Sequence, residues 1–305
     1  MIARINRFTE RNRGAVLSKA WEATLVRLWL RLRLREALRP MIRPRQPQGW
    51  IFMGGCYNSG TTILREILGA HPDIGTLPRE GLDLTDAFPD LEQGGWPRMG
   101  FRNAQMIDQV NADPTAAADR AQRDWSLWWD RGAKVFLEKS ILHGAWMPAL
   151  EQGFQGARFI GVVRNGYCAC EGIRRRSRPA GVAAQLLGQA TYPIDEVGRQ
   201  WVFSNQALRR DGPKLGQYRE IRYEDFTANP AGTARDLFRF VGLDDRLVQD
   251  QGGGKIRVGT REFTISNQNA DSIARLTSSD LAAINPVISP MMRDLGYDVI
   301  EENPV

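Results

Sequence analysis

A glycine-rich loop between an apolar strand and an apolar helix is the feature that most constrains the fold of this 305-residue chain. The run WIFMGG ends in glycines at residues 54 and 55, and TTILREILGAHP follows from residue 61 with its apolar residues on one helical face. A turn of this kind directs backbone N–H groups and the positive end of a helix dipole at an anion. We therefore predict a phosphate-binding loop at residues 55–62.

This loop lacks the lysine of nucleotide kinases. Gly55 and Gly60 have the spacing of G-x-x-x-x-G-K-[ST], but Thr61 occupies the position of the lysine. In kinases and ATPases that amine and Mg²⁺ carry much of the charge stabilisation for γ-phosphoryl transfer. The later apolar run FIGVV ends in Arg164 and not in an acid, which suggests a second phosphate group and no metal ion. A nucleotide kinase without the lysine is the less favoured alternative.

Apolar strand-like runs alternate with helix-like runs in the rest of the chain. A helix is expected from about Leu142 to Gln152, and another over residues 229–243, closed by Gly242. Such alternation is typical of a parallel sheet with helices on both faces. The fold class that we predict is α/β, with a P-loop-like parallel sheet flanked by helices. Its further strands are predicted within residues 133–140, 157–166 and 218–225.

The cysteine content argues against a disulfide-rich protein and against a zinc site. Cys56, Cys168 and Cys170 are too few and too clustered for a disulfide framework, so we expect a reducing compartment and a cytoplasmic protein. Cys168 and Cys170 have no second pair with which to complete four zinc ligands, so no metal site is predicted.

The positive charge of the chain is concentrated near the N-terminus. Residues 1–46 carry 12 Lys/Arg and 3 Asp/Glu, whereas residues 47–305 carry 29 and 32, so no nucleic-acid binding is expected of the body. We predict a basic amphipathic helical arm and linker at 1–46, followed by one domain at 47–305. The arm is expected to dock on its own protein, to self-associate, or to make peripheral membrane contact. The predicted helix has Arg27, Arg31, Arg35 and Arg39 on one side and Trp21, Leu25, Leu28, Trp29 and Leu32 on the other.

Four segments together resemble the sulfotransferase family that uses 3′-phosphoadenosine 5′-phosphosulfate (PAPS). They are GCYNSGTTILREILGAHPDIG, FLEKS, ARFIGVVRNG and IRYEDFTANPAGTARDLFRFVGL, in this order. The resemblance covers about residues 50–300 and is closest to the bacterial carbohydrate-type and tyrosylprotein-type branches. It implies the sulfotransferase fold, PAPS as sulfuryl donor, and a reaction that needs no metal.

The resemblance also implies roles for particular residues. Ser59, Gly60, Thr61 and Thr62 are expected to hold the 5′-phosphosulfate, with Tyr57 and Asn58 in the same loop. Arg164 is expected to hold the 3′-phosphate, and Tyr223 to lie beside the adenine.

The chain departs from the family pattern at two of the expected donor-binding positions. Asn58 stands where the family usually has Arg or Lys, and Gly172 stands where it usually has a serine that binds the 3′-phosphate. Arg174, Arg175 and Arg176 either supply the missing charge or form a solvated helix end.

Transfer of a sulfuryl group to a hydroxyl needs alignment, a base and stabilisation of the leaving phosphate. Glu80 is the favoured base, because it follows the loop by one helix and one short strand and so falls at the carboxyl edge of the sheet. The alternatives are His143 and His71, or a Glu80 that only pairs with Arg79. Lys139 in FLEKS is the candidate for charge stabilisation, unless it only pairs with Glu138 on the surface.

The acceptor is expected to be a hydroxyl-bearing molecule, with a glycan favoured. Trp125, Trp128 and Trp129 have helical spacing and belong either to the core or to an acceptor pocket. A non-catalytic PAPS- or PAP-binding scaffold is the alternative function, since Asn58 and Gly172 depart from the family pattern.

Overall fold

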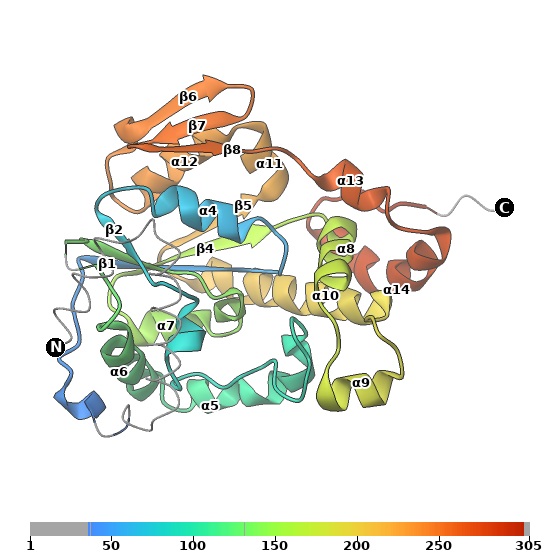
Figure 1. Ribbon diagram of the computed structural model, residues 1–305, viewed down its shortest axis with the longest axis horizontal. Helices are drawn as coiled ribbons and strands as arrows, with labels where there is room; N and C mark the ends of the chain where they lie inside the picture. The colour runs from blue at the N-terminus through green and yellow to red at the C-terminus, as the bar shows by residue number, and fades with distance from the viewer. Residues whose placement is uncertain (1–35, 37, 131, 302–305) are drawn as a thin grey trace, which may run out of the picture.

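A five-stranded parallel sheet organises the computed structural model, which describes residues 36, 38–130 and 132–301 (Figure 1). The strand order is β2-β3-β1-β4-β5, and every neighbouring pair is parallel. This confirms the predicted α/β class, and the predicted strands are all present. They are β1 (Gly49–Gly55), β2 (Ile74–Thr76), β3 (Val135–Glu138), β4 (Ala157–Val163) and β5 (Tyr218–Arg222).

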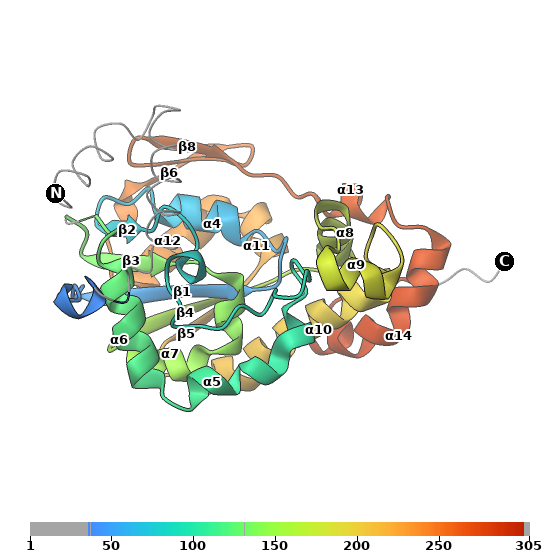
Figure 2. The ribbon, with the colours of Figure 1, turned by 60° about the horizontal axis from the view of Figure 1, so that its bottom comes forward.

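Strand β1 lies at the centre of the sheet and is buried on both faces. Ile51 and Met53 belong to an apolar cluster with α4 (Thr61–Leu68) and α12 (Pro230–Phe240). Trp50 and Phe52 belong to a second cluster with α6 (Pro114–Trp125), α7 (Met147–Gly153) and α10 (Ile194–Asp211). Successive side chains of a strand point to opposite faces, so the continuous apolar run of β1 packs against the helices on both faces of the sheet. Figure 2 shows these two helical layers on either side of β1.

Several helices gather at one end of the molecule, around α10 (Figures 1 and 2). Helix α10 packs on both α8 and α14, and α8 packs on α13. Helix α8 follows β4 directly and begins at an N-cap, where Asn165 accepts hydrogen bonds from the backbone of Tyr167 and Cys168. The bounds of this group are α8 (Gly166–Arg176), α9 (Gly181–Leu187), α13 (Asn269–Ile273) and α14 (Ser278–Asp294). Two other α-helices of the described residues are α5 (Asp108–Asn111) and α11 (Tyr223–Ala228).

A small antiparallel sheet that the sequence analysis missed lies over α12. It consists of β6 (Val248–Gly252), β7 (Lys255–Val258) and β8 (Arg261–Thr264). The chain leaves β8 and runs past α11 to α13 (Figure 1). Ser266 of this connection lies beside Tyr223, which follows β5 and donates from its hydroxyl to the carbonyl of Ser266 at 3.2 Å.

Two local predictions need correction. The helix expected from Leu142 to Gln152 is a short 3₁₀ segment, Ile141–Ala145, followed by α7, which has a proline in its first turn. Helix α6 ends at Trp125, so the tryptophans do not form a stripe along one helix. Trp125 and Trp129 are fully buried among other aromatic rings, and they belong to the core and not to an acceptor pocket.

Most of the predicted arm, including its helix, lies outside the described residues. The end of the predicted linker packs on the domain: Arg39 forms an ion pair with the buried Asp124, and Arg45 donates to the carbonyl of Trp129 at 2.8 Å. Arg123 also donates to the carbonyl of Ile42 at 2.8 Å. Among the described residues, no helix has both the length and the apolar character to span a bilayer.

Candidate functional site

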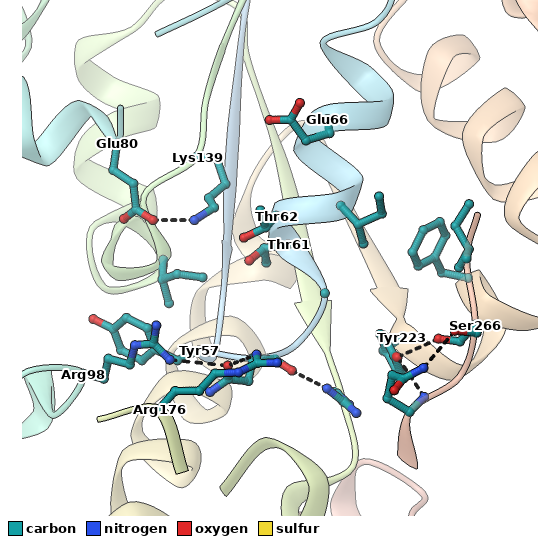
Figure 3. A pocket seen from close by; sticks show the side chains of 18 of the residues that line it. Tyr57, Thr61, Thr62, Glu66, Glu80, Arg98, Lys139, Arg176, Tyr223 and Ser266 are labelled. Carbon is teal, nitrogen blue, oxygen red and sulfur yellow. Dashed lines mark hydrogen bonds and ion pairs between the residues drawn. The ribbon is translucent and has the colours of Figure 1, made fainter. Parts of the chain in front are cut away.

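A cavity of about 720 Å³ opens at the carboxyl edge of the main sheet (Figure 3). Each of the five parallel strands is followed by a residue that lines it, which is where ligands bind in open α/β sheets. Glu80 comes after β2, Lys139 after β3, Asn58 after β1, Arg164 after β4 and Tyr223 after β5. The sheet therefore brings five distant parts of the chain together at this site.

The loop after β1 has the backbone of an anion cradle. Gly60 is the N-cap of α4 with φ 89°, and a Cβ there would lie 2.7 Å from Cδ2 of Tyr223, so only glycine fits. Helix α4 has no side-chain cap, which leaves its first N–H groups directed at the cavity. Asn58 also has a left-handed backbone, with φ 60°.

The hydroxyl groups of the loop are placed differently from one another. Thr61 and Thr62 line the cavity, as expected for ligand-binding donors. Ser59 does not line it: its side chain is fully buried below the loop, and its Oγ has no hydrogen-bond partner among the described residues. The predicted role of Ser59 as a donor thus has no support from its position.

Arg164 and Tyr223 form a stacked pair on the opposite wall. The guanidinium carbon lies 4.1 Å from the centroid of the tyrosine ring. Arg164 donates to the carbonyl of Asn58 at 2.6 Å and to Oδ1 of Asn269 at 2.9 Å. Its buried Nη2 has no hydrogen-bond partner within the described chain. Because a buried guanidinium N–H is costly to leave unpaired, this atom fits an anionic ligand in the cavity.

Only one of the three consecutive arginines of α8 reaches the cavity. Arg174 forms an ion pair with Asp280, and Arg175 pairs with Glu171. Arg176 lines the cavity and donates to Oδ1 of Asn58 at 2.8 Å (Figure 3). Burial and the neighbouring positive charges, chiefly those of Arg175 and Arg98, lower the pKa of Arg176.

Gly172 packs beneath the loop and does not line the cavity. It lies on α8, where a Cβ would be 3.0 Å from Cβ of Asn58. The expectation that position 172 contacts the donor therefore needs correction, since the side chain of Asn58 covers it.

Glu80 and Lys139 form an ion pair at the other end of the cavity (Figure 3). Lys139 is 8% exposed and Glu80 is 40% exposed, so the lysine anchors a carboxylate that faces the solvent-filled space. Glu80 pairs with Lys139 and not with Arg79, and Lys139 does not pair with Glu138. The two predicted catalytic side chains are thus in contact with each other.

His143 is placed in the core, outside the cavity lining. Its Nδ1 contacts the carboxylate of Glu138, which also accepts hydrogen bonds from the backbone N–H of Gly81 at 2.5 Å and of Ser140 at 3.1 Å. Although burial raises the pKa of Glu138, the contact with His143 and these hydrogen bonds lower it overall. The pair supports the segment that carries Glu80, and the position of His143 does not suit a base.

His71 is also remote from the cavity. It lies beyond the end of α4, packs on Phe238 with ring centroids 5.1 Å apart, and accepts a hydrogen bond from the backbone of Asp73 at 3.1 Å. Its placement is that of a structural residue.

Glu92 and Arg98 line the cavity but were missed from the sequence. The hydroxyl group of Tyr57 donates to Glu92, and the backbone N–H of Arg98 donates to the same carboxylate. Burial raises the pKa of Glu92 despite these bonds. No motif or periodicity marks the segment around them, so only the tertiary structure reveals their place.

A second cavity of about 800 Å³ shares Tyr57, Glu80 and Glu92 with the first. Its charged lining is mostly acidic. Burial, and next the charge of Glu80, raises the pKa of Asp83 in this wall. The charged residues of the second cavity are Arg79, Glu80, Asp83, Asp86, Asp90 and Glu92.

Comparison with known proteins supports the same reading. The model of the sulfotransferase family matches residues 50–246. A putative protein-tyrosine sulfotransferase of Caenorhabditis briggsae is 24% identical over 275 residues, which cover 83% of this chain and 91% of the relative. Protein-tyrosine sulfotransferase 1 of Danio rerio is 25% identical over 269 residues, which cover 81% of this chain and 72% of the relative.

A solved structure shares the fold. The sulfotransferase domain of the Synechococcus PCC 7002 olefin synthase superposes with a TM-score of 0.52 and 21% identity, covering 84% of this chain and 97% of that domain. The family model spans more than half of the chain and includes the loop, Lys139, Arg164 and Tyr223. The chain belongs to the sulfotransferase family, and the match includes most of the residues that line the cavity.

Proposed function

We propose that the protein transfers the sulfuryl group of PAPS to a hydroxyl group of an acceptor held in the second cavity, with Glu80 as the general base. The observation that carries this proposal is the position of Glu80. It lines both cavities, and its partner Lys139 lines the first. A base must lie within reach of both the acceptor hydroxyl and the reacting sulfur.

The donor would occupy the first cavity. The N-terminus of α4 with Thr61 and Thr62 suits the 5′-phosphosulfate, since N–H groups and hydroxyls converge there. The unpaired Nη2 of Arg164 suits the 3′-phosphate, and Tyr223 lines the cavity next to it, where the adenine would lie. These are the same roles that the family resemblance implies for the three elements.

The transfer needs only the donor, the acceptor and two side chains of this protein. The acceptor oxygen forms a bond to sulfur while the bond from sulfur to the bridging phosphate oxygen breaks. The acceptor proton passes to Glu80, and PAP leaves with the bridging oxygen. Lys139 stabilises the negative charge that develops on that oxygen, as preorganised cations do in group transfer. No redox partner is needed.

The lining of the second cavity favours a neutral or cationic acceptor. Two of its five carboxylates are ion-paired, Asp86 with Arg39 and Glu80 with Lys139, and the other three, Asp83, Asp90 and Glu92, outnumber Arg79 and would repel an anion. Carboxylates also accept hydrogen bonds from sugar hydroxyls. We therefore propose a neutral glycan as the first acceptor class. A tyrosine side chain is the second, because curated relatives are protein-tyrosine sulfotransferases.

The test is transfer of radiolabelled sulfate from PAPS to acceptor panels. Neutral glycans, uronic-acid glycans and tyrosine peptides of graded charge should be compared at equal concentration. We expect labelling of neutral glycans and none of uronic-acid glycans. Labelling of tyrosine peptides alone would replace the glycan by tyrosine, and preferential labelling of anionic acceptors would overturn the charge argument.

A further inference from the structure

Arg98 is a cation without a counter-ion at the boundary of the two cavities. It lines the donor cavity, and the described residues offer it no ion pair. Its Nη1 lies 3.4 Å from Oδ1 of Asn58, and its guanidinium carbon lies 5.9 Å from the centroid of the Tyr57 ring. Figure 3 shows Arg98 beside Tyr57, on the side of the cavity where Glu80 and Lys139 lie.

The backbone of Arg98 is held in an unusual conformation. Its φ is 63°, which a residue other than glycine adopts only at a cost of about 1 kcal/mol or more. The backbone of Arg98 faces the carboxylate of Glu92, whose pKa it lowers, and the same carboxylate accepts a hydrogen bond from the hydroxyl of Tyr57. The guanidinium of Arg98 contacts Asn58 of the loop, which is 40 residues away in sequence.

Two positive charges converge on the amide oxygen of Asn58. Arg176 donates to the same Oδ1 atom as Arg98, and the charge of Arg98 is among the causes that lower the pKa of Arg176. Like charges at close range destabilise each other unless an anion joins them. Arg176 lies on α8, which begins two residues after Arg164. Arg98 lies over Tyr57, which lines both cavities.

We propose that Arg98 contacts the transferred sulfuryl group and supplies the charge that Asn58 cannot. This inference rests on the proposed function and adds a catalytic residue to it. The sulfuryl group must lie between the loop and Glu80 for transfer to occur, and Arg98 borders that space. A cation there attracts the sulfonate oxygens of the bound donor and keeps their charge balanced while the bond to phosphate breaks.

Calorimetric titration with PAPS and with PAP tests the proposal, because the two ligands differ only in the sulfuryl group. Arg98→Gln should weaken PAPS binding about tenfold or more and leave PAP binding within about twofold, as expected for one lost charge-assisted hydrogen bond. Arg102→Gln is the matched control, since Arg102 lies in the same segment but pairs with Glu196 outside the cavity. It should change neither affinity. Thermal unfolding of each variant checks that the fold is intact.

Charge restoration gives a second test. Asn58→Arg in the Arg98→Gln background should recover the lost PAPS affinity, because it returns a cation to the loop beside the same space. Equal weakening of PAPS and PAP by Arg98→Gln would make Arg98 a phosphate ligand, and unchanged binding of both would make it structural; either result overturns the proposal. If the wild-type protein binds neither ligand, the proposed function fails instead.

Discussion

Asn58 and Gly172, the two positions that depart from the family pattern, lie against each other. A Cβ at position 172 would be 3.0 Å from both Cβ and Cγ of Asn58 and 3.3 Å from its Nδ2. The asparagine side chain has room only because position 172 is glycine. The two departures are therefore one structural change, in which Asn58 turns toward α8 and accepts a hydrogen bond from Arg176.

This contact predicts an energetic coupling between positions 58 and 172. Alanine is about 1 kcal/mol more favourable than glycine in a helix interior. Gly172→Ala should nevertheless fail to stabilise the wild-type protein, because the new Cβ presses on Asn58. In an Asn58→Gly background the same substitution should raise the free energy of unfolding by about 0.5–1 kcal/mol. Urea unfolding of the four proteins measures this, and an identical effect of Gly172→Ala in both backgrounds would refute the coupling.

Arg164 should discriminate between ligands with and without a 3′-phosphate. Arg164→Ala removes the unpaired Nη2 and the stacking on Tyr223. We expect PAP binding to weaken tenfold or more, since a charge-assisted hydrogen bond contributes about 1.5–3 kcal/mol. Binding of adenosine 5′-phosphosulfate, which lacks the 3′-phosphate, should change much less. A calorimetric comparison in which both ligands lose affinity equally would show that Arg164 only supports the loop through the carbonyl of Asn58.

The ion pair between Arg39 and Asp124 should stabilise the domain at neutral pH. Asp124 is fully buried and Arg39 is 14% exposed, so Arg39→Gln should lower the free energy of unfolding by about 2 kcal/mol, less than the 3–5 kcal/mol of a fully buried pair. A truncation that starts after residue 46 should lose more stability than Arg39→Gln, because it also removes the hydrogen bonds of Ile42 and Arg45, whereas one that starts at residue 38 should keep all of them.

The pH dependence of this effect follows from the carboxyl group. Burial raises the pKa of Asp124, although the bonds from Arg39 and Thr85 oppose the shift. Loss of Arg39 raises this pKa further. As pH falls through it, the folded variant gains a proton at Asp124 and no longer needs the cation, so the gap to wild type should narrow. Denaturant unfolding between pH 7 and pH 4 tests this, with the exposed Arg246→Gln as a control that should show little change.

The elements that build the donor cavity could be predicted because their signals are local. An apolar run that ends in glycine, followed by an apolar helical face, predicts the bounds of β1, the loop and α4 to within a few residues. Arg164 and Lys139 follow apolar strands directly, so the rule that ligands bind at the carboxyl edge of the sheet located them without further information.

The remaining features depend on packing between distant segments. Arg98 reaches the loop through a left-handed backbone conformation, with φ 63°, that an arginine in the sequence does not predict. Gly172 lies against the side chain of Asn58, a contact between α8 and the loop that sequence spacing does not predict. The tryptophans after α6 were ambiguous because helical spacing alone does not distinguish a core face from a ligand face.

The pairing of Glu80 with Lys139 leads to the sharpest test of the mechanism. Glu80→Gln keeps the size and hydrogen-bonding capacity of the side chain but removes its basicity. Turnover with a true acceptor should fall about 100-fold or more, as expected for a lost general base, while PAP affinity changes by less than about 1 kcal/mol. Lys139→Met should also lower turnover. The double variant should lose far less than the product of the two effects, because the two side chains form one ion pair and loss of either one disturbs the other. Asn58→Arg should not rescue Glu80→Gln, since added charge at the loop does not replace a proton acceptor.

Single-turnover sulfate transfer under saturating PAPS separates these effects on turnover from effects on donor binding. Near-normal turnover of Glu80→Gln would show that the ion pair is structural, and the search for the base would then move to Glu92, the other carboxylate that borders both cavities.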